Sequence, residues 1–139
     1  VLLPLICSKV DIPVIAAGGM VDGSSMAASM ALGAEGILMG SRMVSSEESP
    51  VHDNWKQAII DAAETDTVFL NRHTSPSLRA LRTERSEALE FDMETNAMTA
   101  LIGTTQDLYF GGDMNASLAL AGQVHGVLCT YKQKIYRNN

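Results

Sequence analysis

The chain has 139 residues, 46% of them hydrophobic, and its 16 acidic and 10 basic side chains give a net charge of −6. An acidic chain without a basic stripe is not expected to bind nucleic acid, and no apolar run is long enough to span a bilayer. The apolar start lacks the basic segment and cleavage site of a secretory signal. The cysteines, Cys7 and Cys129, are far apart and show no metal-ligand spacing. We therefore expect a cytoplasmic protein with buried, reduced thiols.

Three apolar segments near the start of the chain predict a helix and two strands. The first, residues 1–8, reads VLLPLICS and predicts a helix. Residues 13–17 form a short continuous apolar run, and residues 36–39 repeat it. Such runs are typical of parallel strands that are covered on both faces. With a helix between them, these strands predict a βαβ unit with a right-handed crossover.

The helix between the strands is expected to run through residues 26–31. Asp22 or Ser24 is suited to cap its start, and Gly33 to follow its end. Its methionines are Met26 and Met30, which fall at helical spacing and are expected to fill the core.

A glycine turn follows each of the two predicted strands. Because the carboxyl ends of parallel strands meet at one edge of a sheet, both turns are expected to open at the same edge. Backbone N–H groups at Gly19 and Gly40, with the Ser41 hydroxyl, suit one phosphate. Either turn alone is also compatible with a simple tight turn, but two turns one βα unit apart favour phosphate. The candidate phosphate-binding residues are Gly18, Gly19, Met39, Gly40 and Ser41.

The middle of the chain is expected to be mostly helical. Residues 52–64 form an amphipathic pattern around Trp55, and residues 67–70 form a short extended piece. Residues 77–90 predict a charged helix, and residues 95–101 are helical in composition. The arginines of the charged helix are Arg79, Arg82 and Arg85. They either lie in ion pairs on a solvated face or contact an acidic partner or a nucleotide.

A last helix is expected over residues 115–128, followed by a polar tail. Two glycines inside it, Gly122 and Gly126, imply close approach to another backbone or to a cofactor. Packing against the preceding unit is the favoured reason. Gln123 is a lesser candidate for a contact to a cofactor or a phosphate.

Three segments, taken together, resemble a known family. Residues 12–57, from IPVIAAGG to VHDNWKQ, resemble the end of the barrel in the nitronate monooxygenases, formerly 2-nitropropane dioxygenases. That family includes the flavin-dependent enoyl-acyl-carrier-protein reductases. Residues 66–68 and 76–82 resemble its D-T-V and P-x-R-x-L-x-N segment, and residues 121–126 resemble its A-G-Q-x-x-G ending. The resemblance covers nearly the whole chain.

The resemblance implies an α/β fold, the carboxyl-terminal portion of a (β/α)8 TIM barrel. A complete barrel needs about 200 to 250 residues, so this chain is expected to hold only its last two strands. Residues 1–46 would carry those strands and the phosphate site of FMN. Residues 47–112 would form a small inserted, mostly helical domain that covers the substrate. Residues 113–139 would form the closing barrel helix and the tail.

The same resemblance implies FMN as cofactor and a small-molecule substrate. The expected activity is oxidation of alkyl nitronates by an FMN-dependent monooxygenase. The alternative is an FMN-type enoyl reductase that uses NAD(P)H. In the family the catalytic histidine lies in a part of the barrel that is missing here. The histidines of this chain, His52, His73 and His125, do not match it, so no catalytic residue is assigned.

A non-catalytic alternative belongs to a different class of function. The chain would then be a truncated fragment that binds phosphate compounds or associates with itself. Two parallel strands without their barrel neighbours leave open edges and an uncovered apolar face. We therefore expect either a homo-oligomer or a missing amino-terminal part of the barrel.

Overall fold

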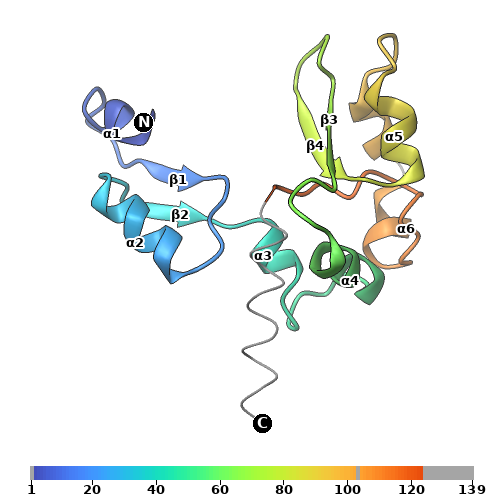
Figure 1. Cartoon of the computed structure of the whole chain (residues 1–139), viewed down its shortest axis with the longest axis horizontal. Helices are drawn as coiled ribbons and strands as arrows, with labels where there is room; N and C mark the ends of the chain where they lie inside the picture. Colours follow the sequence, from blue (N-terminus) through green and yellow to red (C-terminus); the bar gives the residue numbers. More distant parts are fainter. Residues whose placement is uncertain (1, 103, 124–139) are drawn as a thin grey trace.

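The computed structural model describes residues 2–102 and 104–123. Figure 1 shows two groups of elements, with α1, β1, α2 and β2 on one side, β3, β4, α4, α5 and α6 on the other, and α3 between them. No helix in the described part is long and apolar enough to cross a membrane. In chain order the elements are α1 (Leu2–Cys7), β1 (Ile15–Ala17), α2 (Gly23–Ala31), β2 (Gly36–Leu38), α3 (Ser41–Val44), α4 (Asp53–Asp61), β3 (Thr67–Leu70), β4 (Leu78–Leu81), α5 (Glu84–Glu90), the 3-10 helix η1 (Ala97–Leu101) and α6 (Thr105–Tyr109).

The first group confirms the βαβ unit. β1 and β2 are parallel, and Ala16 lies opposite Ile37. Asp22 caps α2 by accepting the Ser25 N–H at 2.7 Å, and the Ser25 hydroxyl accepts the Asp22 N–H in return. Gly33 follows the end of α2 with φ +101°, a conformation that costs glycine little. The cap is therefore Asp22, one of the two residues that the sequence allowed.

The expected burial of this unit is wrong. Ala16 is the buried residue of β1, whereas Ile15 is 55% exposed and Leu38 at the end of β2 is 63% exposed. Met26 and Met30, expected in the core, are 43% and 38% exposed. Among the described residues β1 and β2 pair with each other alone, and these side chains remain exposed.

The expectation of buried thiols is also not met at Cys7. Its thiol is free and half-buried, and Sγ donates to the Gly33 carbonyl at 3.2 Å. Cys129 lies outside the described residues.

The second group is built on an antiparallel hairpin. β3 pairs with β4, with Phe69 opposite Arg79. Residues 119–121 extend the sheet along the other edge of β4, because Ala80 bridges to Leu120 and the Ala121 N–H donates to the Arg79 carbonyl at 3.1 Å. The hairpin thereby joins two segments that lie far apart in the sequence.

Two helix predictions are therefore wrong in part. Residues 78–81 are strand β4, and the expected helix over 77–90 begins at Glu84, after Thr83 caps it through the Ser86 N–H. Residues 115–123 are not helical, and the rest of the expected closing helix, with Gly126 and His125, lies outside the described residues. In both places pairing with a distant strand outweighs the local helix propensity of Leu, Ala and Arg.

The helix predicted over residues 52–64 is confirmed as α4, although it ends at Asp61, where Ala62 turns to extended backbone with ψ 138°. Two buried clusters flank the sheet of the second group. The first holds Val21, Val51, Trp55, Ile59, Leu81, Leu108, Ala119 and Ala121. The second holds Val68, Leu70, Ala80, Ala97, Ala100 and Leu118. Because Val21 follows the first glycine turn, the first cluster ties that loop to α4 and to the closing segment.

Candidate phosphate site at the glycine turns

The structure brings the predicted glycine turns to one edge of the β1–β2 pair. Gly18 and Gly19 follow β1 directly and have φ +86° and +75°. Met39 and Gly40 follow β2, and Ser41 begins α3. The strands are parallel and remain paired as far as Ala17 and Leu38, so both turns leave the sheet at the same end (Figure 1).

The space beside the turns is open. A Cβ added at Gly18 or Gly40 would meet no atom within 4 Å, and both residues are exposed. At Gly18 and Gly19 the positive φ favours glycine for the backbone itself. At Gly40 φ is −99° and ψ is −80°, outside the left-handed region that favours glycine. At Gly40 the missing side chain therefore leaves open space beside the backbone, and glycine is not needed there for a positive φ.

Ser41 is fixed by a residue far along the chain. Its Oγ accepts the N–H of Gly122 at 3.1 Å, which leaves the hydroxyl proton available to donate. The sequence indicated close approach at Gly122 without naming its partner. The contact is with the second glycine turn, but the stated reason, glycines inside a helix, is wrong because residues 115–123 are not helical.

Among the described residues, His52 and His73 lie in separate places and form no catalytic group. His52 Nδ1 accepts the Asn54 N–H at 3.1 Å and so caps α4. His73 lies in the loop between β3 and β4. Across the described residues no three His, Cys, Asp or Glu side chains are placed to hold a metal ion.

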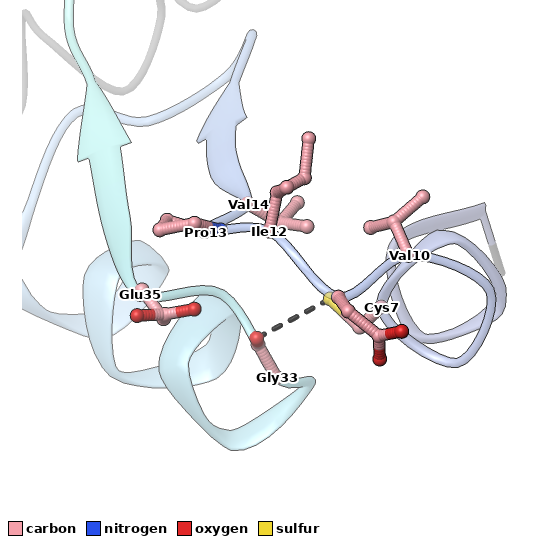
Figure 2. A pocket seen from close by; sticks show the side chains of 8 residues that line it. Cys7, Val10, Ile12, Pro13, Val14, Gly33 and Glu35 are labelled. Atoms are coloured by element: carbon pink, nitrogen blue, oxygen red, sulfur yellow. Dashed lines mark hydrogen bonds between the residues drawn. The ribbon is translucent and has the colours of Figure 1, made fainter.

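A surface hollow lies at the other end of the β1–β2 pair. Figure 2 shows it beside the Cys7 thiol and the carbonyl of Gly33. Val14 and Glu35, which help to line it, precede β1 and β2, so it opens at the edge opposite the glycine turns. It brings together none of the candidate phosphate-binding residues. The glycine turns remain the candidate site because they combine donors with open space.

The fold and the turns define an α/β protein with a candidate phosphate site at the carboxyl ends of two parallel strands. The family model described as nitronate monooxygenase matches residues 1–138, and the chain belongs to this family of oxidoreductases. The parallel strands and their glycine turns are therefore consistent with the family assignment.

Similar proteins support the assignment. A probable nitronate monooxygenase of Staphylococcus saprophyticus is 43% identical over 83 residues, which are 60% of this chain and 23% of that protein. One from Staphylococcus haemolyticus is 39% identical over 89 residues, 64% of this chain and 25% of that protein. The chain thus aligns with about a quarter of the length of these curated relatives.

Two solved structures are also similar to nearly the whole of this chain. FabK from Thermotoga maritima is 34% identical with a TM-score of 0.81, over 99% of this chain and 47% of that one. Nitroalkane oxidase from Streptomyces ansochromogenes has a TM-score of 0.65 at 23% identity, over 97% of this chain and 44% of that one, which shows the fold alone. Both are TIM barrels. The chain therefore spans just under half of each of these two solved chains.

Proposed function

We propose that this chain supplies the phosphate-binding part of an FMN-dependent oxidoreductase of the nitronate monooxygenase type. The observation that carries the proposal is the pair of open glycine turns at one edge of parallel strands, with Ser41 held beside them. The family assignment supports the choice of a flavin nucleotide. In this proposal β1 and β2 are the last two strands of a barrel, and residues 47–112 form the inserted segment.

The residues present fit the phosphate end of FMN. Main-chain N–H groups beside Gly18, Gly19, Met39 and Gly40 would donate to the phosphate oxygens, and the Ser41 hydroxyl would add a further donor. The lack of side chains at Gly18 and Gly40 lets the anion come close to the backbone. When bound, the flavin supplies the electron transfer that oxidation of an alkyl nitronate requires. The role of this chain is to position the nucleotide.

The phosphate contribution can be isolated with two ligands. We expect the 139-residue chain to bind FMN more tightly than riboflavin, which lacks the phosphate, by at least tenfold. The measurement is quenching of flavin fluorescence during titration with protein. Equal affinity for both ligands, or binding of neither, would overturn the proposal.

A variant at Gly40 tests the open space without disturbing the backbone. Gly40→Val should abolish the preference for FMN over riboflavin while leaving the unfolding midpoint close to that of the parent chain, because φ is negative and a Cβ would meet no atom within 4 Å. The steric control is Ala31→Val, at the exposed far end of α2. The charge control is Arg82→Ala. If Arg82→Ala weakens FMN binding as much as Gly40→Val, side-chain charge rather than the backbone holds the phosphate.

A second candidate function is the FMN-type enoyl reductase, which uses NAD(P)H. The observation that favours it is the 34% identity to FabK across 99% of this chain. The discriminating test uses the protein with FMN bound. Reduction of the flavin by NAD(P)H supports this candidate, whereas reduction by an alkyl nitronate without NAD(P)H supports the first.

A further inference from the structure

Arg79 on β4 is held in place by two neighbours on β3. Its Nη1 donates to the Thr67 hydroxyl at 3.0 Å, and its Cζ lies 5.4 Å from the centre of the Phe69 ring. The side chain is half-buried. A guanidinium tethered by a hydrogen bond and an aromatic ring has lost much of its rotamer freedom before any ligand arrives.

Arg72 and Arg82 are neutralised, whereas Arg79 and Arg85 have no ion pair among the described residues, and Arg85 Nε is buried without a hydrogen-bond partner. Arg72 pairs with Glu90 at 3.4 Å, and Arg82 pairs with Glu87 at 3.1 Å and with Glu90 at 3.5 Å. The pKa of Arg82 is raised, chiefly by its hydrogen bond to Glu87. Within the described residues no carboxylate lies within 4.0 Å of the Arg79 guanidinium. Its Nη2 and Nε donors are therefore left for a partner that the described chain does not supply.

The direction of Arg79 follows from strand alternation. Leu70 and Ala80 belong to the buried cluster that also packs against Leu89 of α5, so Phe69 and Arg79 lie on the opposite face of the hairpin. In Figure 1 α5 stands on one side of the hairpin and the β1–β2 pair on the other. Arg79 thus belongs to the sheet face turned away from α5.

The sheet also brings Arg79 close to the second glycine turn. The Ala121 N–H donates to the Arg79 carbonyl, and the next residue, Gly122, donates its N–H to Ser41 Oγ. One strand spacing of about 4.8 Å and one residue rise of about 3.4 Å separate the backbone of Arg79 from the residue that holds Ser41. The guanidinium itself leans over β3, on the side of β4 away from residues 119–121, so this distance relates the two backbones and not the guanidinium to the turns.

We propose that Arg79 binds an oxyanion of a small molecule on the face of the hairpin turned away from α5. The Nη2 and Nε donors form a fork that suits two oxygens on one centre. The oxyanion comes either from a planar group of the substrate, a nitronate or a carboxylate, or from a phosphate of a nucleotide. The neighbouring Phe69, which is 37% exposed, offers apolar surface to the rest of the ligand. The inference rests on the proposed flavin function for the identity of the ligand but not for the anion contact itself.

The test follows the Nε–H resonance of Arg79 by NMR in the whole 139-residue chain, assigned through its loss in Arg79→Gln. Propionate, propane-2-nitronate and inorganic phosphate are titrated separately, without FMN. We expect a saturable shift at Arg79 and no saturable shift at Arg72 or Arg82. Tighter binding of propionate and the nitronate assigns the oxyanion to a substrate, and tighter binding of phosphate assigns it to a nucleotide. A linear, non-saturating response of Arg79 to all three probes would overturn the proposal.

Variants separate binding from support of the fold. Arg79→Gln should weaken binding of the preferred probe at least tenfold, read from the shifts of neighbouring amides, and Thr67→Val should weaken it several-fold by releasing the tether. Arg72→Gln is the matched control and should leave the affinity unchanged. Equal effects of Arg72→Gln and Arg79→Gln would count against the proposal. Because Arg79→Gln should retain the preference for FMN over riboflavin, a failure here is distinct from a failure of the phosphate site.

Discussion

Asn71, at the end of β3, is expected to be among the residues on which the second group depends most. It is 3% exposed and has φ 58°. Its Nδ2 donates to the Pro76 carbonyl at 2.8 Å and to Asn96 Oδ1 at 2.9 Å, and its Oδ1 accepts the buried Ala97 N–H at 2.8 Å. One side chain thereby joins the hairpin to the start of η1.

The cost of removing this side chain follows from these contacts. Asn71→Gly loses all three hydrogen bonds at about 1 kcal/mol each and leaves the Ala97 N–H without its partner, so we expect a loss of about 3 kcal/mol in the free energy of unfolding. Asn71→Ala should cost about 1 kcal/mol more, because an L residue with a Cβ is strained at positive φ. The difference in stability between Asn71→Ala and Asn71→Gly therefore gives the cost of the positive φ, separate from the cost of the lost hydrogen bonds.

The assay is urea unfolding followed by the fluorescence of Trp55, the single tryptophan, which is 2% exposed in the other cluster. With a slope of about 1.5 kcal/mol per molar urea, Asn71→Gly should lower the midpoint by about 2 M. Asn115→Ala, at an exposed asparagine, is the control and should change stability by less than about 0.5 kcal/mol. The reasoning is refuted if both Asn71 variants stay within 1 kcal/mol of the parent, or if alanine is tolerated better than glycine.

Three further outcomes are expected. Gly112→Ala should lower the urea midpoint strongly, because its φ is +74° and a Cβ would lie 2.3 Å from His52 Nδ1. The pKa of Asp92 is lowered to about 2, chiefly by the side-chain hydrogen bond from Thr95, so its contribution to stability is complete above the ordinary value of 3.8 and is lost as the pH falls toward 2. The stability difference between the parent chain and Asp92→Asn should therefore shrink over that interval in urea titrations. Leu38→Glu should reduce self-association in light scattering without lowering the unfolding midpoint, since this side chain is 63% exposed.

The local signals in the first part of the chain were sufficient to predict its elements. Asp22 and Gly33 mark the two ends of α2. The short apolar runs before and after this helix are typical of strands. Burial could not be predicted in the same way. The exposure of Ile15 and Leu38 depends on which neighbouring layers are present, and a residue pattern shows only that a side chain suits a core.

The middle of the chain shows where local propensity fails. Leu78 to Leu81 contain good helix formers, yet they pair with β3 on one edge and with residues 119–121 on the other. A usable signal was present, since Thr83 with Ser86 is a capping pair that places the helix start after the strand. The prediction of the candidate site was limited in a similar way. Adjacent glycines revealed the turns, but the contact from Gly122 to Ser41 joins residues 81 positions apart and no spacing rule predicts it.

That contact sets an order of events during synthesis. When the ribosome has made β1, β2 and the second glycine turn, Ser41 still lacks the amide that holds it, because Gly122 is 81 residues downstream. The nascent chain can form the parallel pair early but completes the turn only after the hairpin has emerged and the closing segment has aligned along β4. The hydrogen bond from Gly122 to Ser41 therefore closes a loop of 81 residues, so this turn is complete only when the hairpin and the closing segment are in place.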